Sequence, residues 1–164
     1  YEESLRTPLL IRYPKEIPAG SIVNKMIQNL DFAPTFLDYA GAKKPEDIQG
    51  TSFRNIVNQK ESIWRDAIYY TYYEYPSVHM VKRHHGVRTE RCKLIHFYYD
   101  IDEWELYDLD QDPSEMNNLY DNPEYSSVQK RLHLRLSELR KHYGDSDSLD
   151  QMHIKRYVTS LKNK

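Results

Sequence analysis

One stretch of this chain, residues 88–120, constrains the fold more than any other, and it reads RTERCKLIHFYYDIDEWELYDLDQDPSEMNNLY. Its β-branched and aromatic residues favour strands. We predict strands over about residues 86–98 and 103–109, joined at residues 100–102. Asp112 and Pro113 are predicted to begin a helical turn, with Glu115 in the position of a capping box. The stretch is therefore typical of a β-hairpin that leads into a capped turn.

Helical patterns stand on both sides of this hairpin. Asp31 can cap a helix that runs through Tyr39, with Pro34 in its first turn and Gly41 after its end. A longer helix is predicted from residue 122 to Gly144, because its apolar residues recur every three or four positions. These residues are Tyr125, Val128, Leu132, Leu136, Leu139 and Tyr143.

The first part of the chain carries a different signal. Residues 7–13, TPLLIRY, form a nearly continuous apolar run that Pro14 closes, as strands buried on both faces of a parallel sheet do. Polar connectors follow at residues 43–47 and 58–61, and we place the domain boundary at the second. Residues 1–60 are then expected to end a larger α/β domain. Residues 61–164 are expected to form a smaller α+β subdomain, an antiparallel sheet with a packing helix.

The composition excludes several classes of function. The net charge is −2 and the pI about 6.4, so no overall field attracts nucleic acid or an anionic membrane. No run approaches the roughly 20 apolar residues of a membrane span. The single cysteine, Cys92, excludes an internal disulfide and a cysteine-rich metal cage. Since Cys92 stands mid-strand among residues with core periodicity, we interpret it as a packing residue rather than a nucleophile.

Charge is divided unevenly along the chain. Residues 79–93 contain five Lys or Arg and one acid, whereas residues 99–115 contain eight acids and no Lys or Arg. If these strands pair, opposite charges face each other and stabilise a solvated hairpin. This interpretation accounts for most of the charged residues, because charge runs are usually solvated faces.

Lys82, His84 and His85 allow a second interpretation, a substrate-binding site. They follow a loop that contains Pro76 and stand near several tyrosines. Aromatic faces stack on sugar rings and positive donors bind sulfate or carboxylate oxygens, so such a group would suit an anionic sugar. Adjacent side chains on a strand point to opposite faces. His84 and His85 could therefore differ in role, or both be neutral surface side chains.

A metal site is not predicted. His79 and His84 are five positions apart with no cysteine or close carboxylate, a spacing that fits no zinc pattern. The acidic turn after Tyr99 lacks the glycine and the spacing of a calcium loop. We expect neither a metal ligand nor a catalytic residue in this chain.

Several short sequence motifs, here called words, occur in this chain in the same order as in the type I sulfatases and resemble theirs. The type I sulfatases are the alkaline-phosphatase-like enzymes that hydrolyse sulfate esters. The words are YEESLRTPLL at residues 1–10, DFAPTFLDYAG at 31–41, QGTSF at 49–53, RTERCKLI at 88–95, WELYDL at 104–109 and DPSEMNNL at 112–119. The words YYEYP and RHHGVRTER look most like the N-acetylglucosamine-6-sulfatase branch. The resemblance implies the C-terminal part of an alkaline-phosphatase-like α/β sulfatase, with a small antiparallel sheet packed by a long helix.

The same resemblance implies a sulfated carbohydrate as substrate, and a calcium ion and a formylglycine in the full-length enzyme. Formylglycine is made from Cys or Ser in a C/S-x-P/A-x-R motif, and the chain contains neither this motif nor the D-H-G or D-N-G word of the metal ligands. We therefore expect the missing N-terminal sulfatase domain to be its partner, and the chain alone to be inactive. Sulfatases of this kind are mostly periplasmic, secreted or lysosomal, and we expect a periplasmic or secreted location. The alternative is a non-catalytic glycan-binding or interaction module.

Overall fold

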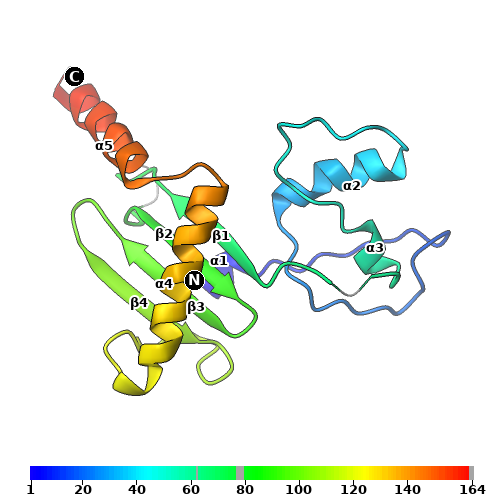
Figure 1. Cartoon of the computed structure of the whole chain (residues 1–164), viewed down its shortest axis with the longest axis horizontal. Coiled ribbons are helices and arrows are strands. Elements are labelled where there is room, and N and C mark those ends of the chain that lie inside the picture. The colour runs from blue at the N-terminus through cyan, green and yellow to red at the C-terminus, as the bar shows by residue number, and fades with distance from the viewer. Residues whose placement is uncertain (62, 77–79, 163–164) are drawn as a thin grey trace. The chain divides into compact units, whose positions relative to one another are not determined.

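The computed structural model describes residues 1–61, 63–76 and 80–162, with side chains as far as residue 159. The chain forms two compact units, one of Glu3–Asp66 and one of Tyr1–Glu2 together with Ala67–Lys164 (Figure 1). No helix in the described residues is long and apolar enough to cross a membrane.

The unit Glu3–Asp66 consists of short helices joined by long irregular segments (Figure 1). The predicted helix after Asp31 is confirmed, since α2 covers Phe32–Tyr39 and Gly41 follows it with a φ of 66°. The remaining helices are α1 (Glu2–Leu5), η1 (Asn29–Asp31) and α3 (Arg54–Val57). The buried core of this unit is Phe53, Ile56 and Val57, against which Ile17, Val23, Ile27, Phe32 and Trp64 pack.

Two of the sulfatase-like words contact each other in this unit. Three hydrogen bonds join residues 31–38 to residues 51–53: Thr51 N to Asp31 Oδ1 (3.0 Å), Ser52 Oγ to Asp38 Oδ2 (2.6 Å) and Phe53 N to Thr35 Oγ1 (3.1 Å). Gly50 lies so close to the preceding backbone that a Cβ there would stand 1.8 Å from the carbonyl oxygen of Leu30. Only glycine fits this approach, so the two words form one folded contact.

The prediction of a buried strand at residues 7–13 is wrong for this structure. The segment is irregular and exposed, and Leu10 is 94% exposed. A parallel strand needs hydrogen-bonding neighbours, and the strands in the described part of the chain all belong to one sheet of the other unit. The apolar run therefore has no strand to pair with among these residues.

The second unit contains a four-stranded antiparallel sheet in the order β1-β2-β3-β4 (Figure 1). The strands are β1 (Ala67–Tyr72), β2 (His84–Thr89), β3 (Cys92–Phe97) and β4 (Glu103–Asp108). The single strand predicted over residues 86–98 is wrong, because a tight turn at Glu90 and Arg91 divides it into β2 and β3. Thr89 Oγ1 holds this turn by accepting from the backbone nitrogen of Cys92 and donating to its carbonyl oxygen, both at 2.9 Å.

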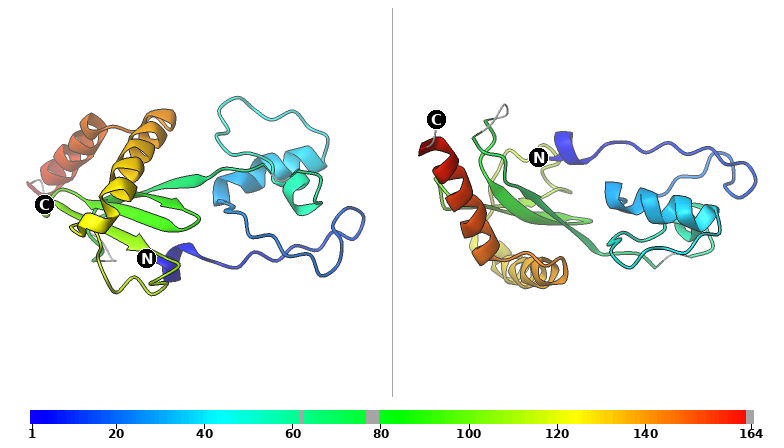
Figure 2. Two further views of the ribbon diagram at one scale, coloured as in Figure 1. Left: turned by 60° about the horizontal axis from the view of Figure 1, so that its bottom comes forward. Right: turned by 90° about the horizontal axis from the view of Figure 1, so that it is seen from above.

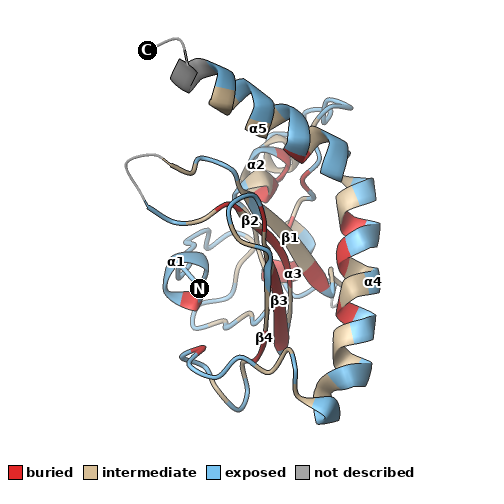
Figure 3. Cartoon of the chain, turned by 90° about the vertical axis from the view of Figure 1, so that its left-hand side faces the viewer, coloured by how far each residue is buried: buried red, intermediate tan, exposed pale blue. Residues whose placement is uncertain are grey.

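The helix α4 (Ser126–His142) covers one face of the sheet, which we call the helix face; the opposite face is the outer face. Figure 2 shows α4 on one side of the sheet and the start of the chain on the other. The predicted helix is confirmed, with the short η2 (Pro123–Tyr125) before it and Gly144, at a φ of 72°, after it. Figure 3 shows its buried residues turned toward the sheet. The core is Ala67, Val87, Cys92, Leu94, Leu106, Leu132, Leu136 and Leu139.

Cys92 is 4% exposed within this core, which confirms its interpretation as a packing residue. Burial raises the pKa of its thiol, so the thiolate form that a nucleophile needs is disfavoured.

The last helix, α5 (Asp147–Lys162), packs by aromatic contacts on the segments next to the sheet. The His153 ring stacks on Tyr73 with centroids 5.6 Å apart, and the Tyr157 ring meets the edge of Tyr99 at 6.5 Å.

Asp108, at the end of β4, carries one of the ion pairs between the basic and the acidic segments. Its buried carboxylate accepts hydrogen bonds from Arg91 Nε (3.0 Å) and Nη2 (2.6 Å) and from the Tyr125 hydroxyl (2.9 Å). The Arg91 hydrogen bonds lower the pKa of this carboxyl to about 2. The predicted pairing of opposite charges therefore occurs here, at one end of the sheet.

Replacing Asp108 by asparagine should destabilise this unit in a pH-dependent way. Because the folded pKa lies below the ordinary value of 3.8, the charged carboxylate stabilises the fold above about pH 4, and this contribution is lost as the pH falls toward 2. Arg91 is 58% exposed, so we expect a cost of only about 1–2 kcal/mol at pH 7. Urea unfolding at pH 7 and pH 2.5 tests this, and an equal cost at both values would contradict it.

Candidate functional site

His84 and Lys82 lie together at one end of the outer face, where the sequence predicted a substrate site. His84 stands on β2 directly between Tyr72 of β1 and Phe97 of β3. Its ring stacks on Tyr72 with centroids 5.6 Å apart and lies 5.2 Å from the Phe97 ring. The imidazole is thus held in a fixed orientation by aromatic neighbours on both sides.

One hydrogen bond sets the chemistry of His84. Its Nδ1 lies 2.8 Å from the carbonyl oxygen of Lys82, and because a carbonyl can only accept, Nδ1 carries the proton. Burial lowers the pKa of His84, so the ring is neutral at pH 7 and Nε2 has a free lone pair. This nitrogen can accept a hydrogen bond from a sugar hydroxyl.

Lys82, two residues before His84 in the chain, supplies a cation. Its Nζ pairs with the Asp100 carboxylate, lies 2.9 Å from the Tyr75 hydroxyl and stands 4.4 Å from the centre of the Tyr75 ring. The hydrogen bond to Asp100 raises the pKa of Lys82, so the amine is charged. A bound sulfate would share this amine with Asp100 or displace it. His79, which the sequence analysis considered as a metal ligand, lies outside the described residues.

His85 lies on the helix face, away from Lys82 and His84. It is 2% exposed, and burial lowers its pKa to about 3. Its neighbours are His96, at 3.4 Å between Nε2 and Nδ1, and Asp150 of α5, at 3.9 Å between Nδ1 and Oδ2. A substrate could not reach this ring without displacing α5, so the structure separates His85 from the other two predicted residues.

A glycine keeps the outer face flat next to His84. A Cβ on Gly86 would lie 2.6 Å from the Tyr70 hydroxyl and 2.7 Å from the Leu94 carbonyl oxygen. Gly86 and Tyr70 are paired across β1 and β2, so the Tyr70 ring can cross the sheet only over a residue without a side chain.

The other end of the outer face holds a buried group of charges, the Lys93 ion cluster, formed by Glu2, Arg88, Lys93 and Glu115. Lys93 is fully buried, and its Nζ lies 2.8 Å from Glu2 Oε1 and 2.6 Å from Glu115 Oε1. Arg88 Nη2 lies 3.0 Å from Glu2 Oε2, and the backbone nitrogen of Glu2 donates to Glu115 at 2.5 Å. Two cations and two carboxylates therefore balance inside the fold.

Glu115 does not form the predicted capping box. It has a φ of 53°, in the left-handed region, and its carboxylate bonds to Lys93 and to the start of the chain. The Asp112 carboxylate instead accepts from the backbone nitrogens of Met116 (2.7 Å) and Asn117 (2.8 Å). The interpretation of Arg88, Lys93 and Glu115 as solvated charges is wrong, because the turn at Glu90 and Arg91 pairs Arg88 with Lys93 across β2 and β3, and both join ion pairs inside the fold.

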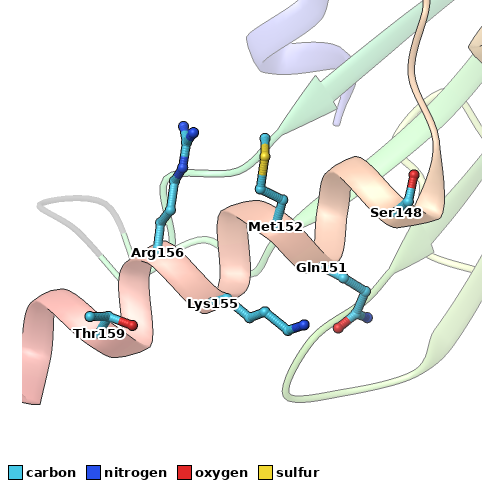
Figure 4. A pocket seen from close by; sticks show the side chains of 6 residues that line it. All are labelled: Ser148, Gln151, Met152, Lys155, Arg156 and Thr159. Carbon is cyan, nitrogen blue, oxygen red and sulfur yellow. The ribbon is translucent and has the colours of Figure 1, made fainter.

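A hollow of about 740 Å³ lies along α5 (Figure 4). Its lining residues are Ser148, Gln151, Met152, Lys155, Arg156 and Thr159. They repeat at helical spacing along one face of this helix, and Figure 4 shows their side chains spread along it rather than converging. The hollow therefore lacks converging side chains that could bind a ligand, and none of the predicted substrate residues lines it.

Comparison with known proteins shows that the chain is similar to sulfatases, and it also identifies the family within them. The family model described as "N-sulphoglucosamine sulphohydrolase, C-terminal" matches residues 1–142. The chain belongs to this family.

The curated relatives are longer than this chain. It is 54% identical over 150 residues to an N-acetylglucosamine-6-O-sulfatase of Bacteroides thetaiotaomicron, covering 90% of this chain and 27% of that protein. It is 28% identical to an arylsulfatase of Clostridium perfringens, covering 99% of this chain and 34% of that protein. The chain thus spans between a quarter and a third of these relatives.

Solved structures show the same fold. BT4656 in complex with its substrate D-glucosamine-2-N,6-O-disulfate superposes with a TM-score of 0.80 at 53% identity, over 83% of this chain and 28% of that one. The sulfatase yidJ from Bacteroides fragilis superposes with a TM-score of 0.70 at 22% identity, over 84% and 30% of the two chains. The predicted fold, the C-terminal part of an alkaline-phosphatase-like sulfatase, is confirmed.

Proposed function

We propose that this chain is the C-terminal part of a carbohydrate sulfatase that removes the 6-O-sulfate of N-acetylglucosamine or a related glucosamine. The observation that carries this is the 54% identity to an N-acetylglucosamine-6-O-sulfatase across 90% of the chain. The 53% identity to a structure bound to a 6-O-sulfated glucosamine supports the same class of substrate. The partner is then an N-terminal sulfatase domain, and the expected location is periplasmic or secreted.

Within such an enzyme, Lys82 and His84 are the residues that we propose to bind substrate. The neutral His84 offers a fixed acceptor to a sugar hydroxyl, and the charged Lys82 offers a donor to sulfate oxygens. Tyr72 and Phe97 hold the imidazole between them. His85, buried on the helix face, is not part of this proposed site.

The residues of this chain do not fit formylglycine. The C/S-x-P/A-x-R motif from which it is made is absent from all 164 residues, and Cys92 lies in the packed core. We propose that formylglycine and calcium belong to the N-terminal domain of the complete enzyme. The residues described above then bind and orient substrate, and perform no bond-breaking step themselves.

Exposed apolar side chains support the view that further protein covers this chain. In the unit Glu3–Asp66, Leu10, Ile22 and Phe36 are 94%, 84% and 68% exposed. In our proposal the N-terminal domain covers these side chains, which a free-standing module would expose to water.

An activity screen of the complete protein tests the proposed function. We expect inorganic sulfate to be released from N-acetylglucosamine-6-sulfate, and more slowly from the 3- and 4-sulfated isomers. Sulfate release from none of these sugars, together with saturable binding of the same sugars, would support the alternative glycan-binding module instead.

A further inference from the structure

A second cluster of polar side chains lies at α5, on the face of the sheet opposite to His84. It consists of His85 on β2, Asp145 in the connection between α4 and α5, and Asp150 on α5. Each offers one ligand atom, and these atoms all lie within 4.8 Å of one another. Two parts of the chain that are distant in sequence, β2 and residues 145–150, thus meet at one point.

His85 points an unsatisfied nitrogen into this cluster. Only 2% of the surface of His85 is accessible to solvent. Its Nδ1 has no hydrogen-bond partner among the described residues. The other ring nitrogen, Nε2, lies 3.4 Å from His96 Nδ1. With Nδ1 left free for a metal ion, the ring proton lies on Nε2 and can be donated to His96 Nδ1. An orphaned buried nitrogen is uncommon and calls for a partner.

The charges around this nitrogen are not balanced. Arg140 is the cation recorded in ion pairs with the acids here, and it pairs with Asp145 (3.3 Å), Asp147 (2.6 Å) and Asp150 (2.8 Å). The Asp147 side chain is 90% exposed and is screened by water. The two carboxylates of the cluster, Asp145 and Asp150, face one guanidinium, which leaves a net charge of 1 − 2 = −1 when both are ionised. Asp145 also accepts from the Tyr69 hydroxyl and from the backbone nitrogen of Ser146.

A cation can enter without removing Arg140. An ionised carboxylate has about four lone-pair sites, so an oxygen that accepts from Arg140 can also bind a metal ion. Around a tetrahedral ion with bonds of about 2.0–2.2 Å, ligand atoms lie about 3.4 Å apart. The Nδ1 of His85 and the Oδ2 of Asp150 are 3.9 Å apart, so a movement of less than about 1 Å would close this pair.

We propose that His85 Nδ1, Asp145 and Asp150 bind one divalent transition-metal ion, best Zn²⁺, with Arg140 as an outer partner of the carboxylates. One imidazole nitrogen and two carboxylate oxygens suit Zn²⁺, whereas Mg²⁺ and Ca²⁺ prefer oxygen ligands alone. The ion would join the sheet to the connection before α5 and to α5 itself. This site is independent of the proposed sulfatase activity, and its test does not require a substrate.

Metal titration of the untagged, metal-stripped 164-residue chain tests the site. We expect one equivalent of Zn²⁺ to bind by native mass spectrometry. At a hundredfold excess over Kd it should raise the Tm by about 5 °C or more. The same concentration of Mg²⁺ should leave the Tm unchanged.

Two variants and one control decide the outcome. Asp145→Asn keeps the shape of a partly exposed side chain and should lose the Zn²⁺ equivalent, as should His85→Ala; His142→Ala, on the exposed side of α4, should retain it. If His85→Ala fails to fold, Asp145→Asn and Asp150→Asn replace it, and both should lose the Zn²⁺ equivalent. The proposal would be overturned if the wild-type chain bound no Zn²⁺, or if all the variants bound it as tightly as wild type. If wild type bound no Zn²⁺, a buried water would be the partner of His85 Nδ1.

Discussion

Replacing Lys93 by methionine is expected to destabilise the sheet unit by about 3–5 kcal/mol, the usual cost of removing one partner from a buried ion pair. Lys93 is fully buried and touches both Glu2 and Glu115. Methionine fills a similar volume but leaves Glu115, whose side chain is 1% exposed, without its cation. The measurement is urea unfolding, in which the midpoint should fall by about 2 M.

Lys130→Met is the matched control for this experiment. Lys130 is an exposed lysine on α4, and surface substitutions of this kind usually change stability by less than about 0.5 kcal/mol. Equal midpoints for Lys93→Met and wild type would show that the Lys93 ion cluster does not hold the fold. The cluster also ties Glu2 to the sheet, so residues 1–2 should become sensitive to proteases in Lys93→Met and not in the control.

The double variant Lys82→Ala with His84→Ala, made in the complete enzyme, is expected to lower kcat/KM for the sulfated sugar about 10- to 100-fold. A hydrogen bond to a charged group contributes roughly 1.5–3 kcal/mol, and each 1.4 kcal/mol is about a tenfold change. Because these residues bind substrate in our proposal and break no bond, most of the loss should fall on KM. The thermal unfolding curve should change little.

A matched pair of substitutions separates this effect from a general loss of charge. Lys141 and His142 are an exposed lysine and histidine at the end of α4, on the side of the sheet away from the outer face. Their double alanine variant should keep wild-type kcat and KM. If both double variants behave alike, or if neither changes KM, Lys82 and His84 are not substrate contacts.

The elements that could be predicted from the sequence are those whose structure follows from a local pattern, such as helical spacing or strand alternation. The stripe from Tyr125 to Tyr143 follows helical spacing and packs on the sheet as predicted. The opposite directions of His84 and His85 follow from strand alternation, and the structure has them on different faces. The sulfatase-like words at residues 31–41 and 49–53 bond to each other, which explains their presence together.

The remaining features depend on contacts between distant residues. The turn at Glu90 and Arg91 contains neither glycine nor asparagine, the usual signals of a tight hairpin turn, and is held by the Thr89 side chain. The sequence does not signal this turn, so it does not predict that Arg88 and Lys93 share one face of the sheet. The Lys93 ion cluster therefore could not be predicted from the sequence. His85, Asp145 and Asp150 are brought together only by the packing of α5.

Sulfate release by the 164-residue chain and by the complete protein, compared on N-acetylglucosamine-6-sulfate, tests the central claim most directly. We predict that the complete protein releases inorganic sulfate and that the folded 164-residue chain, at the same concentration, releases none. Release by this chain alone at the rate of the complete protein would contradict the account, which assigns the nucleophile to the N-terminal domain.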